Sequence, residues 1–221
     1  MPDLILFDID GTLVRRAGPH HRQALVEAVR QITGIETTTD GIPVHGMLDP
    51  DILTQMMCAA GIDETEIPPM MPAILDTAQD LYQTGVPDLR DKVCPGVTPL
   101  LDRLRATETT LALVTGNLTR IGWRKLERAG LHHYFRFGAF GEMAPTRGGL
   151  ARLAIERARR EGLVDGRISL IGDATQDVVA ARENGIRSIA VRTGITPPAD
   201  LEASAPDMLL DDLTHVDFTI L

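Results

Sequence analysis

Three short apolar runs, each ending in small or acidic residues, constrain the fold of this chain more than any other feature. They cover residues 4–7, 110–114 and 168–171. A continuous apolar run of four or five residues is typical of a strand buried on both faces of a parallel sheet. The carboxyl ends of such strands form the edge at which open α/β sheets bind ligands. We therefore expect the residues that follow these runs to line a site.

Four aspartates follow the first and third of these runs. Asp8 and Asp10 come directly after residues 4–7, and Asp173 and Asp177 follow the run that ends at residue 171. Asp8 and Asp10 are two apart, so in extended backbone their side chains point the same way. Carboxylates gathered in one cleft repel each other, and a bound hard cation such as Mg²⁺ relieves that repulsion. The pattern predicts a metal site built from two distant parts of the chain.

Between the first and second runs the strand pattern gives way to helical spacing. Leu25, Val29 and Ile32 recur at helical intervals, and Gly34 is expected to end that helix. Asp49 as N-cap and Pro50 at the first helical position are expected to open a second helix. A third apolar stripe runs from residue 74 to residue 82.

From residue 97 onward, strands and helices alternate, which favours a parallel sheet. The helices are expected at residues 97–106, 118–129, 148–161 and 175–184, and the strands at 110–115, near 135–140, and at 168–172, 187–192 and 207–210. The predicted fold class is α/β, a Rossmann-like parallel sheet core with an inserted all-helical domain.

Composition excludes several other classes of protein. The net charge of −9 argues against nucleic-acid and anionic-membrane partners. No apolar run reaches the 18 residues of a membrane span, and the first residues show no secretory signal. The two cysteines, Cys58 and Cys94, have no metal or redox spacing and are expected to be free thiols. A cytoplasmic protein is the expectation.

The three motifs together resemble those of the haloacid dehalogenase-like hydrolase superfamily. Asp-Ile-Asp-Gly-Thr-Leu-Val at residues 8–14, Leu-Val-Thr-Gly-Asn at 113–117 and Ile-Gly-Asp-Ala-Thr-Gln-Asp at 171–177 look like its motifs I, II and IV, in order. The resemblance runs from residue 3 to about residue 212 and is strongest to the phosphoglycolate phosphatase and β-phosphoglucomutase type. It implies a hydrolase core of residues 1–14 and 89–221 and a helical cap domain of residues 15–88.

The resemblance implies a role for each motif residue. Asp8 would be the nucleophile that forms an aspartyl-phosphate, and Asp10 the general acid and then the base. Thr115 would bind a phosphoryl oxygen, with backbone N–H groups near Gly116 and Asn117 assisting.

The resemblance also implies Mg²⁺ as cofactor. Asp173 would ligate the ion together with the Asp8 carboxylate and the Asp10 carbonyl. Asp177 would orient these metal ligands or ligate the ion directly. Such a cation offsets the repulsion between a carboxylate nucleophile and an anionic phosphate.

One motif departs from the family pattern, because the usual motif III lysine is missing. Arg147 stands where it would fall, and we hypothesise that its guanidinium balances the charge of Asp8 and the phosphate; the alternative is an ordinary residue at a helix start. Lys125 is the other cationic candidate, but its position favours a solvated helix face. Whether Arg147 or Lys125 replaces the motif III lysine stays open.

The cap is expected to choose the substrate. The loop from His45 through Gly46 to Asp49 resembles the family's cap loop that dips towards the active site, although a surface loop would read the same way. Candidates for contacts with the substrate near the hinge and loops are Arg15, Arg16, His20, His21, His45, Gly46 and Met47. Solvated positions remain the alternative for both histidines of the helix start and for the two arginines.

These inferences predict a Mg²⁺-dependent phosphatase that hydrolyses a small phosphorylated metabolite and acts as a monomer or homodimer. A β-phosphoglucomutase-like mutase is the alternative among enzymes. A non-catalytic relative that binds a phosphometabolite or a protein partner is the alternative from another class. The absence of lysine between residues 14 and 88 disfavours the phosphonoacetaldehyde hydrolase reaction, which uses a cap lysine. Asp10 and the full acidic motif IV disfavour dehalogenation.

Overall fold

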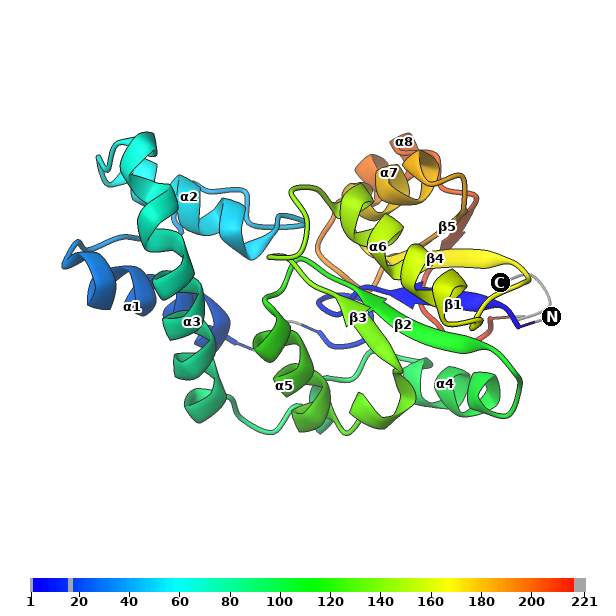
Figure 1. The fold of residues 1–221 in the computed structure, drawn as a ribbon. Helices are drawn as coiled ribbons and strands as arrows, with labels where there is room; N and C mark the ends of the chain where they lie inside the picture. Colours follow the sequence, from blue (N-terminus) through cyan, green and yellow to red (C-terminus); the bar gives the residue numbers. More distant parts are fainter. Residues whose placement is uncertain (1, 16–17, 217–221) are drawn as a thin grey trace.

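A single parallel sheet organises the molecule, with helices on both of its faces (Figure 1). The computed structural model describes residues 2–15 and 18–216. The strand order is β3-β2-β1-β4-β5-β6, and every neighbouring pair is parallel. The strands are β1 Leu4–Phe7, β2 Thr110–Val114, β3 Phe137–Ala139, β4 Ile168–Gly172, β5 Arg187–Val191 and β6 Met208–Leu210. This confirms the predicted fold class and places motifs I, II and IV on three adjacent strands.

The two faces of β1 pack against different helices because successive side chains of a strand alternate. Ile5 and Phe7 belong to the core cluster that includes α4 and α5, whereas Leu4 and Leu6 pack with α6 and α7. The helices of this part are α4 Val97–Arg105, α5 Thr119–Ala129, α6 Arg147–Arg160, α7 Thr175–Glu183 and α8 Pro198–Ala203, with short 3₁₀ turns at Arg90–Lys92 and His132–Tyr134. Burial on both faces explains why the strands read as continuous apolar runs.

Three further helices lie between β1 and α4 and stand apart from the sheet, at the left of Figure 1. They are α1 His20–Thr33, α2 Asp49–Ala59 and α3 Ile67–Gly85, with a 3₁₀ turn at Glu64–Glu66, and we call them the cap helices. Gly34 ends α1 as predicted, with φ 71° and its N–H bonded to the Arg30 carbonyl. None of the described helices is both long and apolar enough to cross a membrane.

The chain enters and leaves the cap helices through two paired segments. Val14 forms an antiparallel bridge with Val93, the Arg15 N–H donates to the Lys92 carbonyl at 2.7 Å, and the Cys94 N–H donates to the Leu13 carbonyl at 3.0 Å. The pairing joins the two segments that lead into and out of the cap helices. The division into a core of residues 1–14 and 89–221 and a cap of residues 15–88 stays a prediction, and its residues 1, 16–17 and 217–221 lie outside the described part.

The start of α2 differs from the prediction. Leu48 is the N-cap, Asp49 is already helical, and its carboxylate makes no cap hydrogen bond. Asp49 Oδ2 instead accepts from the Leu118 N–H at 2.9 Å, just before α5 begins. A donor supplied by tertiary packing has replaced the local one, and this bond ties α2 to the edge of the sheet.

Candidate active site

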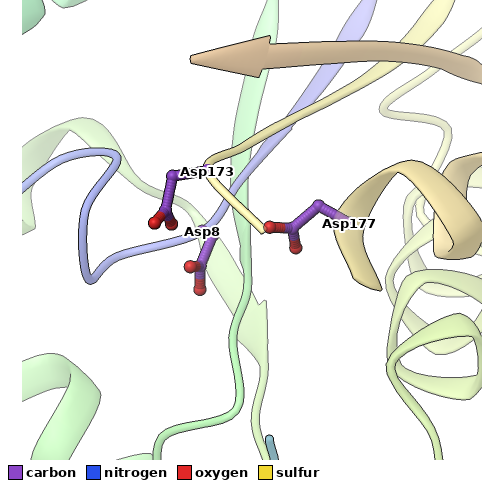
Figure 2. Close-up of side chains that lie close together, drawn as sticks. All are labelled: Asp8, Asp173 and Asp177. Atoms are coloured by element: carbon purple, nitrogen blue, oxygen red, sulfur yellow. The ribbon is translucent and has the colours of Figure 1, made fainter. Parts of the chain in front are cut away.

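Three buried carboxylates meet where β1 and β4 end (Figure 2). Asp8 follows β1, Asp173 follows β4, and Asp177 lies in the first turn of α7. Each offers one oxygen, and the three oxygens lie within 4.8 Å of one another. The side chains are almost fully buried, with Asp173 only 1% exposed. The geometry therefore brings together residues that are about 165 positions apart in the sequence, as the motif pattern predicted.

The electrostatics of this acidic cluster favour a bound cation. Burial raises the pKa of Asp173, and the charges of Asp8 and Asp177 raise it further, against the opposing effect of Arg147. Burial also raises the pKa of Asp177 although Arg147 opposes it. Asp173 Oδ2 and Asp177 Oδ1 accept no hydrogen bond from the described residues. Buried carboxylate oxygens that accept no hydrogen bond and are held close together suit a hard divalent cation such as Mg²⁺.

Arg147 is the cation of this cluster. It is the first residue of α6, whose N-cap Thr146 accepts from the Gly149 N–H. Its Nη1 lies 3.1 Å from Asp8 Oδ1 and 3.2 Å from Asp177 Oδ1. Burial opposes its charge, but Asp177 and Asp8 outweigh that effect and raise its pKa. The side chain is buried against the carboxylate expected to act as nucleophile, so Arg147 is not an ordinary solvated helix-start residue.

Asp10 has different partners from Asp8 because β1 ends at Phe7 and the extended backbone does not continue. Its Oδ2 accepts from Asn117 Nδ2 at 2.8 Å and from Lys125 Nζ at 2.5 Å. Burial opposes ionisation of Asp10, but the charge of Lys125 and the hydrogen bonds from Lys125 and Asn117 outweigh it and lower its pKa. Asp10 is therefore held as a carboxylate in this arrangement.

Lys125 does not lie on a solvated helix face, and the expectation that it does is wrong. The side chain is 2% exposed and reaches from α5 towards the sheet edge. Besides Asp10, its Nζ contacts Asn117 Oδ1 at 2.6 Å and His21 Nδ1 at 3.2 Å. The helical period carried a signal, because the buried face of α5 comprises Ile121, Gly122, Lys125, Leu126 and Ala129. A lysine inside an apolar stripe is buried towards a partner.

The loop after β2 forms the opposite wall. Thr115 is fully buried and its Oγ1 accepts from Asn117 Nδ2 at 2.7 Å. A Cβ added at Gly116 would overlap the Met47 carbonyl, so only glycine lets the cap loop approach this closely. The Gly116 carbonyl accepts from the Asp49 N–H at 2.9 Å. The predicted phosphate loop and the loop before α2 are thus packed together.

The cap loop reaches the acidic cluster as its resemblance implied. His45 Nε2 lies 3.6 Å from Asp173 Oδ2 and 2.5 Å from Thr196 Oγ1. Gly46 has φ 71°, and a side chain there would overlap Gln176 of α7. His45 is therefore not an isolated surface histidine, although a quarter of its side chain remains exposed.

A cavity of about 480 Å³ opens above these groups. Its floor includes the two motif I aspartates, and its other walls come from the cap helices and the loop of residues 44–47. The predicted residues that line it are Asp8, Asp10, His21, His45, Gly46, Met47, Thr115, Gly116, Asn117, Lys125, Arg147 and Asp173. Arg15 is exposed and does not line the cavity, and Arg16 lies outside the described residues.

Several lining residues were not predicted. Arg22 of α1 lies on the wall and forms no ion pair with the described residues, and Tyr82 of α3 is buried there. Asp49 faces His21, whose Nε2 is 2.9 Å from its Oδ2. Arg22 stands three positions before Leu25 on α1, so the helical period could have placed both on one side. The position of Tyr82 depends on how α3 packs, which no local pattern specifies.

Comparison with known proteins agrees with this geometry. A family model described as HAD-hydrolase-like matches residues 146–216. Phosphoglycolate phosphatase of Agrobacterium fabrum is 28% identical over 95% of this chain and 88% of its own length. That of Pseudomonas putida is 24% identical over 96% of this chain and 78% of its own. β-Phosphoglucomutase of Clostridium difficile superposes with a TM-score of 0.74 at 15% identity, covering 99% of this chain and 95% of that one.

The match to the family model covers about the last third of the chain, which carries Arg147, Asp173 and Asp177, and the matches to the relatives also cover motifs I and II. The structural likeness adds the sheet and the helical cap. The chain is therefore similar to haloacid dehalogenase-like hydrolases, and its relatives include proteins named as phosphoglycolate phosphatases.

Proposed function

We propose that the protein is a Mg²⁺-dependent phosphatase that hydrolyses a small phosphomonoester through an aspartyl-phosphate on Asp8. The enzyme class, a phosphoric monoester hydrolase, rests on the family and on the relatives named as phosphoglycolate phosphatases. The observation that carries the finer proposal is the position of Asp8. Its carboxylate lies at the floor of the cavity, beside two buried carboxylates and a buried guanidinium.

In the first step an Asp8 oxygen attacks the phosphorus of the ester. The bond from phosphorus to the leaving oxygen breaks, and that oxygen receives a proton from Asp10, which first takes one up from solvent as the ester binds. Arg147 offsets the charge that gathers on Asp8 and the phosphoryl group. Thr115 and the backbone near Gly116 and Asn117 supply further donors at the wall of the cavity.

In the second step a water molecule attacks the phosphorus of the aspartyl-phosphate. Asp10 takes a proton from that water, and the bond between phosphorus and Asp8 breaks, which restores the carboxylate and releases inorganic phosphate. The lowered pKa of Asp10 suits this step, because a carboxylate is the form that accepts a proton.

The acidic cluster is where we place Mg²⁺. Asp8, Asp173 and Asp177 would hold it with the Asp10 carbonyl, and the ion would supply positive charge against the phosphoryl oxygens. The orphaned oxygens of Asp173 and Asp177 support this placement. We assign the choice of leaving group to the cap side of the cavity, including His45 and Gly46.

The test is phosphate release from a panel of small phosphomonoesters, with and without Mg²⁺, starting with phosphoglycolate because the relatives carry that name. We expect release that depends on Mg²⁺. A sugar phosphate that is isomerised without phosphate release would instead identify a mutase. Absence of both reactions in well-folded protein would favour a non-catalytic binder.

Replacement of Arg147 tests whether this arginine takes the role of the missing motif III lysine. Arg147→Ala is expected to lower kcat by roughly 10²–10³-fold, since a charge that stabilises the transition state in a buried site is lost. Arg147→Lys should recover part of the loss, because it restores the positive charge without the fork of donors. Arg152→Ala, an exposed position on the same helix, is the matched control. Unchanged turnover in Arg147→Ala would exclude the role.

A further inference from the structure

We propose that Lys125 is a positioning residue for Asp10, and that the cap helices hold Lys125 in place through His21 and Asp49. The inference rests on the proposed phosphatase function. It gives a role to a lysine that lies outside motifs I, II and IV. It arises from a chain of buried hydrogen bonds that runs from the cap to the general acid and base.

Lys125 uses all three of its donors. An ammonium group carries three N–H bonds. Lys125 Nζ has three acceptors, Asp10 Oδ2 at 2.5 Å, Asn117 Oδ1 at 2.6 Å and His21 Nδ1 at 3.2 Å. A buried ammonium with every donor satisfied holds a single orientation. Lys125 therefore holds the Asp10 carboxylate in one orientation.

The two carboxylate oxygens of Asp10 differ in their hydrogen bonds. Oδ2 accepts from both Lys125 and Asn117, whereas Oδ1 accepts no hydrogen bond from any described residue. The side chain is 35% exposed and lines the cavity. One oxygen is thus anchored twice and the other is left to exchange a proton with the leaving group and with water.

The hydrogen-bond partners specify the tautomer of His21. Its Nδ1 faces the Lys125 ammonium, which can only donate, so Nδ1 is the acceptor. Nε2 then carries the proton and donates to Asp49 Oδ2 at 2.9 Å. Asp49 Oδ2 also accepts from the Leu118 N–H, next to α5. His21 and Asp49 come from the cap helices α1 and α2, so cap and core meet in this chain of bonds.

Each of the two motif I aspartates therefore has its own buried cationic partner. Arg147 lies against Asp8, and Lys125 lies against Asp10. Because the third bond of Lys125 comes from α1, the setting of Asp10 depends on where the cap lies. Displacing the cap removes the His21 acceptor and leaves a buried donor unpaired, which is unfavourable.

The experiment compares Lys125→Met with Arg124→Met, a neighbour on α5 whose one ion pair among the described residues is with Glu127. The probes are p-nitrophenyl phosphate, whose leaving group departs without a proton, and an alkyl phosphate, whose leaving group needs one. Each is measured with Mg²⁺ in a rapid-quench instrument, and bound phosphoenzyme is counted.

We expect Lys125→Met to lower steady-state kcat about 10–100-fold for both esters, part of the loss seen when a general acid or base is removed. It should nevertheless show a burst of nitrophenol and accumulate phosphoenzyme, because only the second step with this ester needs Asp10. The alkyl ester should give no burst. Arg124→Met should match the wild type.

A variant at the partly exposed His21 guards against simple misfolding of Lys125→Met. His21→Ala should lower kcat several-fold with little change in KM. His21→Gln should restore it, because its amide can accept from Lys125 and donate to Asp49.

Three outcomes would overturn the inference. In the first, Lys125→Met hydrolyses both esters as fast as Arg124→Met does. In the second, a folded Lys125→Met loses turnover of both esters equally and shows no burst. In the third, His21→Ala and His21→Gln have the same kcat. A wild-type enzyme without Mg²⁺-dependent hydrolysis would overturn the proposed function as well, which separates the two failures.

Discussion

Replacing Asp8 with asparagine is expected to lower kcat for phosphomonoester hydrolysis by roughly 10⁴-fold or more, as losses of a nucleophile do in other enzymes. An amide oxygen is a far weaker nucleophile than a carboxylate, and the amide has almost the same shape. The change also removes one of three mutually repelling carboxylates, so the protein should fold. Phosphate release under saturating Mg²⁺ measures the loss.

The control is Asp3→Asn, which lies just before β1 at the opposite end of the strand and pairs with Arg167. It should keep the wild-type rate. Beryllium fluoride adds a readout without turnover, because a Mg²⁺-dependent adduct should form on the wild type and be absent from Asp8→Asn. Retention of more than a few per cent of the rate in Asp8→Asn would contradict the assignment of the nucleophile.

The sheet edge could be predicted because its signals are local. Each strand is a short apolar run, and parallel strands place their carboxyl ends together, so Asp8, Thr115 and Asp173 were expected to meet. The structure puts all three on the cavity wall. The short helix α8 was missed, since six residues that begin with proline carry no apolar period.

The network around Lys125 could not be read from the motifs. Its burial depends on tertiary contacts such as that with His21 of α1, and a lysine that neighbours Arg124 on a helix resembles a solvated residue. Asp49 shows the same limit, because its local pattern favoured an N-cap while tertiary contacts gave it Leu118 and His21 as partners. Ile32 is 39% exposed although it continues the apolar spacing of α1. Local periodicity places residues on a helix face, and packing decides what covers that face.

The acidic cluster predicts an unusual dependence of stability on pH in metal-free protein. Burial and the charge of Asp8 raise the pKa values of Asp173 and Asp177 above the ordinary carboxyl value of about 4. Between the ordinary and the raised values the folded protein binds more protons than the unfolded chain. The free energy of unfolding therefore falls as pH rises through this range, and levels off once both groups are ionised. We expect the melting temperature without metal to fall between pH 5 and pH 8.

Asp173→Asn should remove much of that fall. The amide is neutral at every pH and relieves the repulsion on Asp8 and Asp177, so the metal-free variant should be the more stable protein at pH 8. A pKa shift of one unit corresponds to about 1.4 kcal/mol, and for a domain of this size about 1 kcal/mol moves the melting temperature by roughly 2–4 °C. Thermal unfolding at pH 5 and pH 8, in the presence of a chelator, measures the effect.

Magnesium should reverse the order of the two proteins. The ion needs ionised ligands and binds only the folded state, so it should raise the melting temperature of the wild type, most at pH 8. Asp173→Asn lacks one ligand and should respond weakly and release no phosphate. Asp200→Asn, an exposed carboxylate of α8, should follow the wild type throughout. A metal-free wild type that is as stable as Asp173→Asn at pH 8 would show that the cluster carries no repulsion for a cation to relieve.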